Sequence, residues 1–423
     1  MKKIYWRPRT VSRPALILNT VIALAGLALV ERCQVVATQP YLDEKTAAAK
    51  LAQDAFAAVK ARRIELGPPI DRLVDPSESG LIGIAMSPVT SVLGDVAAKQ
   101  TSANPNFAAV LVDMLKEVGV RENDVVAIGM SGSFPALNIC TYAACETLKV
   151  KPLVISSASA SQWGANLPTF MWPQMERLLR NWGKKIPIVE NGKPVLDANG
   201  EPTFEEDGVF TIKSIACSIG GNQDRGEGLS EEGIALVKAA IQKIRLRPFR
   251  ADVAKISPEG DVVGSINDDF TDNVDERMHL YKEEAEGKPI KVYINVGGGV
   301  ASVGRDVGKQ MFLPGVNTRP PQHVREIDGV MPRFIKMGIP VIHIVHINAL
   351  ATRYELPLEP AKAPTIGEGG VFKTTDYSRP LVVGVLAVIL ASLYGFIRSD
   401  VGFRLLQASQ RSRQENATPE PMV

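Results

Sequence analysis

Serine and glycine residues gather where a predicted strand turns into a predicted helix. Residues 124–140, DVVAIGMSGSFPALNIC, begin as an apolar run, pass through Gly129, Ser131, Gly132 and Ser133, and continue in a helical pattern. This stretch differs by one residue from G-x-S-x-G, the turn that presents a nucleophilic serine beside an oxyanion-binding N–H. Serine stands at position 133, where that turn has glycine. Ser131 is therefore a candidate nucleophile; in the alternative it is a turn hydroxyl, and Ser133 caps the helix.

A nucleophilic serine needs a base, and the base needs a group that orients it. The histidines of the chain are at positions 279, 323, 343 and 346. His346 is the best candidate base because it lies near the end of a predicted strand, although a buried, hydrogen-bonded histidine is the alternative. Asp224 and Asp306 are both candidate orienting acids, and the sequence does not choose between them.

Two other glycine-rich stretches also follow predicted strands, Gly220-Gly221-Asn222 and Gly297-Gly298-Gly299. Ligands of parallel sheets collect beyond the carboxyl ends of the strands, and glycine lets backbone N–H groups approach an anion. The three loops are therefore predicted to converge on a ligand that carries carboxylate or phosphate. Arg225 and Arg305 follow these loops and are candidate carboxylate clamps, or else ordinary exposed arginines.

Other chemistries find little support in the chain. The sequence has no Walker motif, no G-x-G-x-x-G and no zinc-type cysteine spacing, so neither a nucleotide cofactor nor a metal is predicted. The formal net charge of +2 argues against nucleic acid as a partner. Four cysteines in 423 residues do not make a disulfide scaffold. Cys140 or Cys145 could pair with Cys217, or all three could be free.

The pattern of the elements that position these loops predicts an α/β domain. An apolar content of 45% and a charged content of 22% are those of a folded protein. Alternating patterns predict a mostly parallel sheet with helices on both faces. The predicted strands are 80–87, the run from 124, 151–157, 290–299 and 339–348, and the predicted helices are 41–66, 104–120 and 229–244, the last capped by Ser230.

Two segments interrupt this pattern. Asn191-Gly192 and Asn199-Gly200 predict hairpin turns, so a β-hairpin insertion is expected at about 184–212. Residues 250–289 are charged and poor in long apolar runs, which predicts a surface excursion.

Apolar segments near both ends predict membrane anchors. Residues 14–30 and 381–397 are close to the minimum length of a spanning helix, and basic residues precede the first and follow the second. By the positive-inside rule both termini are expected in the cytoplasm. Cleavage of the first segment as a signal peptide is the alternative. The predicted organisation is a tail 1–14, a membrane helix 15–33, an extracytoplasmic domain 34–378, a membrane helix 379–398 and a tail 399–423.

This layout, together with GMSGSFPALN, CSIGGNQDRGEG and NVGGGVASVG, resembles the bacterial poly-γ-glutamate system proteins. The resemblance spans roughly residues 15–400 and implies a membrane accessory protein of capsule or exopolymer synthesis or export. It transfers no active-site residues. Poly-γ-glutamate carries a carboxylate on every unit, so a cleft that binds the polymer fits the glycine-rich loops, with the synthase or export subunits as further partners. The alternative function is a membrane-anchored serine hydrolase that cuts γ-linked amides through Ser131, His346 and Asp224.

Overall fold

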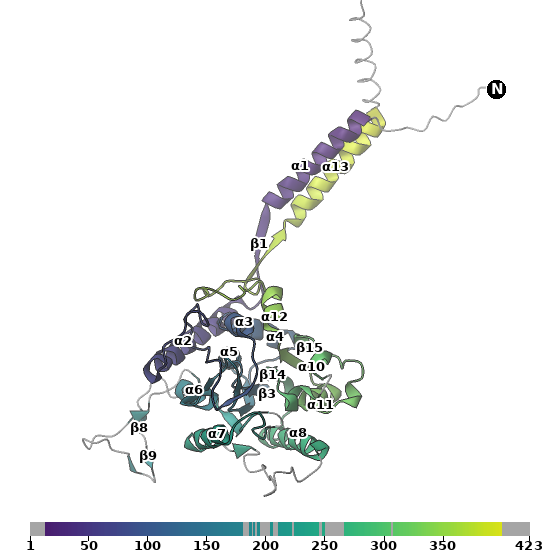
Figure 1. Cartoon of the computed structure of the whole chain (residues 1–423). Coiled ribbons are helices and arrows are strands. Elements are labelled where there is room, and N and C mark those ends of the chain that lie inside the picture. Colours follow the sequence, from purple (N-terminus) through teal and green to yellow (C-terminus); the bar gives the residue numbers. More distant parts are fainter. Residues whose placement is uncertain are drawn as a thin grey trace, which may run out of the picture. The chain divides into compact units, whose positions relative to one another are not determined.

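The computed structural model describes residues 13–180, 210–221, 224–244, 266–305 and 308–399, with the short strands between 186 and 249 that are named below. The chain divides into two compact units, Gln39–Phe372 and a terminal unit made of Met1–Thr38 and Lys373–Val423. Figure 1 shows the helices and strands of both.

The domain Gln39–Phe372 is built on one main sheet. In the described part of the chain this sheet has seven strands in the order β13-β12-β4-β3-β14-β16-β15. All neighbouring strands are parallel except β15, which is antiparallel to β16. The strands are β3 (Val125–Ser131), β4 (Lys151–Ser157), β12 (Ser214–Ser218), β13 (Pro248–Phe249), β14 (Ile290–Val296), β15 (Gly315–Asn317) and β16 (Val341–Ile344). The fold class is α/β with a mostly parallel sheet, as predicted.

The strand order reverses between β3 and β14. From β3 the chain proceeds in one direction through β4, β12 and β13, and β14 then starts again on the other side of β3 and leads to β16. In doubly wound sheets the loops diverge at such a switch point and leave a crevice at the carboxyl ends of the two strands. The topology therefore places a binding crevice beyond Ser131 and Val296.

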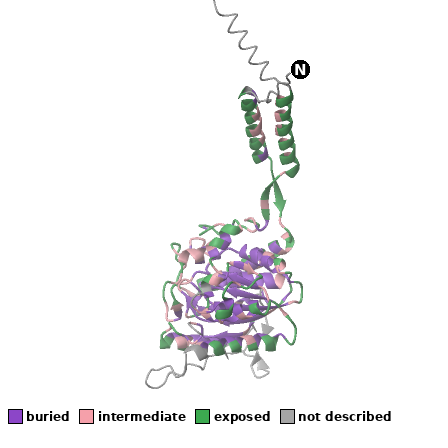
Figure 2. Cartoon of the chain, turned by 90° about the vertical axis from the view of Figure 1, so that its right-hand side faces the viewer, coloured by how far each residue is buried: buried purple, intermediate pink, exposed green. Residues whose placement is uncertain are grey.

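Helices cover both faces of the sheet, as Figures 1 and 2 show. The side chains of β3 alternate: Val126 and Ile128 pack in the core of one face, and Val125 and Ala127 in that of the other. The first core includes residues of α2 (Leu42–Leu66), α4 (Phe107–Glu117), α5 (Pro135–Thr147) and α6 (Trp172–Arg180). The second includes residues of α8 (Ile266–Glu284) and α11 (Val330–Lys336).

Shorter elements connect this framework. The helices are α3 (Val96–Ser102), α7 (Glu231–Lys243), α9 (Val300–Val303), α10 (Gly308–Met311), α12 (Ile347–Arg353) and the 3-10 turn η1 (Val324–Glu326). The small strands are β2 (Thr90–Val92), β5 (Ala160–Ser161), β6 (Asn166–Leu167) and β7 (Phe170–Met171). Ser230 caps α7 as predicted, since its hydroxyl accepts a hydrogen bond from Gly233 N at 3.1 Å.

Two predictions about the domain were wrong. Residues 80–87 do not form a strand. Their backbone makes isolated hydrogen bonds, among them those with Trp163 and with the Asn166 side chain, which accepts from Ile84 N at 2.9 Å and donates to Ile84 O at 2.7 Å. The excursion predicted at 250–289 contains α8, whose Phe270, Val274 and Tyr281 are buried against the sheet. The charged residues on the exposed side of α8 hid its helical pattern in the sequence. Residues 250–265 lie outside the described part of the chain.

The region predicted as a β-hairpin insertion contains two antiparallel pairs. β9 (Val189–Glu190) pairs with β10 (Lys193–Pro194), and β8 (Ile186–Pro187) pairs with β11 (Phe204–Glu205). The rest of 181–209 lies outside the described residues. Antiparallel pairing is what a β-hairpin insertion predicts; the predicted Asn-Gly turns themselves lie outside the described residues.

In the terminal unit, the helices α1 (Arg13–Arg32) and α13 (Arg379–Ser399) pack together, and the strands β1 (Gln34–Thr38) and β17 (Lys373–Tyr377) form an antiparallel ribbon. Asn19 and Ser392 hydrogen-bond between the helices. Windows of 18 residues in α1 and 20 in α13 are long and apolar enough to cross a membrane, and almost none of their residues are buried. Figure 2 shows these two helices largely in the exposed colour.

Candidate functional site

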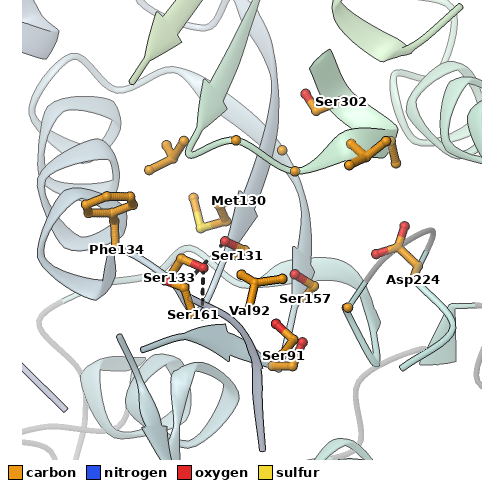
Figure 3. A pocket seen from close by; sticks show the side chains of 18 of the residues that line it. Ser91, Val92, Met130, Ser131, Ser133, Phe134, Ser157, Ser161, Asp224 and Ser302 are labelled. Carbon is orange, nitrogen blue, oxygen red and sulfur yellow. Dashed lines mark hydrogen bonds between the residues drawn. The ribbon is translucent and has the colours of Figure 1, made fainter. Parts of the chain in front are cut away.

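A cavity of about 630 Å³ lies at the carboxyl ends of β3, β4 and β14, where the topology predicts a crevice. We call it the switch cavity. Figure 3 shows side chains from several segments around it, with serine hydroxyls on more than one wall. Its described lining includes Ser91, Ser131, Ser133, Ser157, Ser159, Ser161 and Ser302. The volume suits a ligand of small-molecule size, or a short length of an extended chain.

The structure brings part of each predicted loop to this cavity. Among the residues predicted to bind or react, the lining includes Gly129, Ser131, Ser133, Gly221, Asp224, Gly298 and Gly299. It does not include Gly132, Gly220, Gly297, Arg225, Arg305 or His346. Asn222 and Asp306 lie outside the described residues. Arg305 stacks on the Phe270 ring, with 4.4 Å between Cζ and the ring centroid.

Ser131 is the last residue of β3 and stands in register with Ser157 of β4. The nucleophile elbow requires a strained serine at the apex of a sharp turn, and Ser131 instead has ordinary strand geometry and is not among the residues with positive φ. Its Oγ accepts a hydrogen bond from Ser133 N at 3.3 Å. The helix-capping alternative for Ser133 was wrong, because Phe134 is the N-cap of α5. Ser133 Oγ instead accepts a hydrogen bond from Ser161 N at 3.1 Å, drawn as a dashed line in Figure 3.

His346 is exposed and begins α12 with a left-handed backbone, φ 49°. His343 is buried in β16, where Nδ1 lies 3.0 Å from Asn295 Nδ2. Burial, with His346 nearby, lowers the pKa of His343 to about 4, so this ring is neutral at physiological pH. Among the described residues that line the switch cavity there is no histidine. A base for a cavity serine must therefore come from another residue type.

Asp224 is occupied by structural partners. It accepts hydrogen bonds from Ser218 Oγ at 2.6 Å and Asn273 Nδ2 at 3.0 Å, and it forms a buried ion pair with Arg277. Burial opposes the charged carboxylate, but Arg277 and these hydrogen bonds outweigh that effect and lower the pKa of Asp224. The pair fixes the loop after β12 against α8. In this arrangement Asp224 orients no histidine.

Lys99, which sequence reasoning missed, is a buried basic side chain at the switch cavity. It comes from α3 and is 3% exposed, yet it lines the cavity. Nζ donates to Ser161 Oγ at 2.9 Å and to Ser133 O, and it lies 3.7 Å from the centroid of the Phe134 ring. Burial lowers the pKa of the Lys99 ammonium to about 7, with a smaller opposing effect of Asp95. Only the serine repeat SSASAS at 156–161 hinted at such a site in the sequence.

Glycines at the strand ends serve packing as well as access to the cavity. A Cβ on Gly129 would lie 2.1 Å from Tyr293 Oη, and one on Gly220, whose φ is +84°, would lie 2.2 Å from Ser159 Oγ. A Cβ on Gly299, by contrast, would meet nothing within 4 Å. Gly129 and Gly220 are therefore required by their neighbours, whereas Gly299 borders open space.

The cysteines form no disulfide. Cys140, Cys145 and Cys217 are buried and free, and Cys33 is exposed and free. Burial raises the pKa of the three buried thiols, so they are unreactive. Among the described residues no group of three or more histidine, cysteine, aspartate or glutamate side chains is placed to hold a metal ion.

Comparison with known proteins finds no family model, curated protein or solved structure that matches this chain.

Proposed function

We propose that the chain is a bacterial membrane-anchored accessory protein of poly-γ-glutamate synthesis or export, and that its switch cavity binds the polymer. The observation that carries this proposal is a cavity at the topological switch point that is lined by serine hydroxyls and glycine backbone. Such groups are neutral donors and acceptors. They suit a chain in which amide groups alternate with carboxylates.

The charges around the cavity determine how the polymer is recognised. Lys99 and Arg277 line it together with Asp95, Asp224 and Glu227, so the described lining has no excess of positive charge. Long-range attraction of a polyanion is then weak, and hydrogen bonds must select the repeat unit. Binding of moderate affinity with a shallow dependence on salt is expected.

The terminal unit supplies the membrane anchor in this proposal. α1 and α13 expose large apolar side chains, such as Ile17 at 65% and Val383 at 65%, and a bilayer removes this surface from water. Basic residues outside the two segments support a topology with both termini in the cytoplasm and the α/β domain outside. Periplasmic phosphatase fusions at Tyr41 and Lys362 should be active and one at Val423 inactive. An active fusion at Val423 contradicts this topology.

Polymer binding is tested on the full chain in detergent micelles, by calorimetric titration with a short γ-linked glutamate oligomer. Gly299 lines the cavity and borders open space, so the bulky side chain of Gly299→Phe should block the polymer and abolish binding. Gly299→Ala should bind normally and controls for the backbone. An α-linked oligomer of equal length controls for charge. Equal binding by Gly299→Phe would remove the switch cavity as the site.

The cellular role is tested by deleting the gene in a polymer-producing bacterium. Polymer should decrease or be mislocalised, and the wild-type gene should restore it whereas the Gly299→Phe gene should not. Unchanged amount, length and location of polymer would refute the accessory role. The alternative, a hydrolase that uses Ser131 with His346, lacks the strained elbow, and His346 does not line the cavity.

A further inference from the structure

Lys99 and Ser161 form a contact that a purely binding cavity does not require. A lysine whose only task is to attract carboxylates is best placed with its ammonium in solvent. Lys99 instead lies in the wall, 3% exposed, with Nζ 2.9 Å from Ser161 Oγ. The distance is that of a nucleophile and its base.

Burial makes deprotonation of the Lys99 amine possible near neutral pH. The Phe134 ring, whose centroid lies 3.7 Å from Nζ, stabilises the ammonium, so Lys99 can hold a proton as well as release it. The backbone around Ser161 is held in place: its N–H donates to Ser133 Oγ, and Ser161 pairs with Val92 in the ladder between β5 and β2. Base and nucleophile are thus positioned on separate, packed elements.

Ser159 is the candidate donor for a developing oxyanion. Ser159 lines the same cavity, and its buried Oγ has no hydrogen-bond partner among the described residues. An unsatisfied buried hydroxyl is unfavourable unless a ligand uses it. A carbonyl oxygen of a bound acyl group would satisfy it.

We propose that Ser161 and Lys99 form a catalytic serine–lysine dyad that cleaves an amide or ester in the switch cavity. This activity goes beyond binding and differs from the hydrolase built on Ser131 and His346. Serine–lysine pairs perform acyl transfer without histidine on other folds. The substrate class is an acyl compound whose carbonyl reaches the hydroxyl wall of the cavity.

The reaction proceeds in two balanced halves. The neutral Lys99 amine takes the Ser161 hydroxyl proton as Oγ attacks the carbonyl carbon, and the Lys99 ammonium then protonates the leaving amine or alcohol, which departs and leaves an acyl ester on Ser161. In the second half Lys99 takes a proton from water, the hydroxide attacks the ester carbon, and the proton returns to Ser161 Oγ. The net change is the addition of one water across the scissile bond.

The test is labelling of the full chain in detergent micelles with a fluorophosphonate, in which Oγ displaces fluoride from phosphorus, followed by peptide mass spectrometry. Ser161 should be modified, and Lys99→Met should slow labelling by about 100-fold or more, the usual contribution of a general base. Lys116→Met is the matched control, since Lys116 lies outside the cavity beside Tyr41.

The unmutated chain supplies a second measurement that does not depend on the folding of a variant. Below the pKa of Lys99 the labelling rate of Ser161 should fall about tenfold per pH unit, because only the neutral amine acts as base. Labelling at Ser131, no labelling of folded chain, or a Ser161 rate that is the same at pH 5.5 and 7.5 each overturns the dyad. The binding proposal is tested separately by calorimetric titration of the unmutated chain with the γ-linked oligomer. Labelling of Ser161 without oligomer binding would refute only the binding proposal, and oligomer binding without labelling would refute only the dyad.

Discussion

The helices α5 and α13 are both rich in apolar residues, but they occupy opposite environments. Every residue of α5 from Pro135 to Cys145 is buried in the domain core, whereas none of the apolar window of α13 is buried. The domain removes its apolar surface from water by its own packing, and the terminal unit does not. Apolar composition alone therefore cannot distinguish a core helix from a membrane anchor; the partners of the helix decide.

The largest expected effect is on the free energy of unfolding, and it should differ between a charge placed in α5 and one placed in α13. Ile139→Asp in α5 places an unpaired charge in the core and should destabilise the domain by more than about 4 kcal/mol. Val388→Asp in α13, where the side chain is 57% exposed, should leave urea unfolding of the domain unchanged and reduce the membrane-bound fraction instead. Equal loss of domain stability in both variants would show that α13 belongs to the domain core.

The second prediction concerns the buried Lys99 ammonium, whose lowered pKa should make the stability of the domain depend on pH. Unfolded Lys99 keeps its proton up to its ordinary pKa of 10.5, and folded Lys99 loses it at about 7. Between these pH values folding releases a proton, so stability should rise with pH, by up to about 1.4 kcal/mol per pH unit. Urea unfolding at pH 7, 8 and 9 measures this slope, and Lys99→Met should remove it. An unchanged slope in the variant would mean that Lys99 titrates normally.

Close packing at the strand ends predicts a smaller effect. Gly129→Ala would bring Cβ into the Tyr293 hydroxyl, which hydrogen-bonds to Ser302 Oγ at 2.7 Å. Overpacking of this kind should destabilise the domain by about 1–3 kcal/mol, measured by urea unfolding. Gly299→Ala is the control and should be near neutral because its site is open. Equal stability of the two variants would contradict the packing role of Gly129.

The smallest effect is expected between α1 and α13. Asn19→Leu removes the hydrogen bond to Ser392, and interhelical bonds of this kind contribute about 0.6 kcal/mol on average in membranes. Cysteine cross-linking between the helices should become slightly less efficient, while domain stability stays unchanged. Loss of expression in Asn19→Leu would assign the contact a larger role.

Sequence patterns by themselves determined the α/β class, the strands β3, β4, β14 and β16, the long helix α2 and the two apolar terminal helices. These follow from local periodicity and turn residues, which act over a few positions. They also indicated the strand-end residues Gly129, Ser131, Ser133, Gly221, Gly298 and Gly299 as parts of the cavity wall, because parallel strands bring their carboxyl ends to one edge.

Only the tertiary structure decided which side chains meet in the cavity. Lys99 lies 62 residues from Ser161 in the sequence, and the pairing of β2 with β5 brings their segments together. Asp224, a candidate orienting acid in the sequence, forms an ion pair with Arg277, which lies 53 residues away. Ser131 looks like an elbow in the sequence, but pairing with β4 keeps it in the strand. Such outcomes depend on burial and on contacts between distant segments, and no local pattern encodes either.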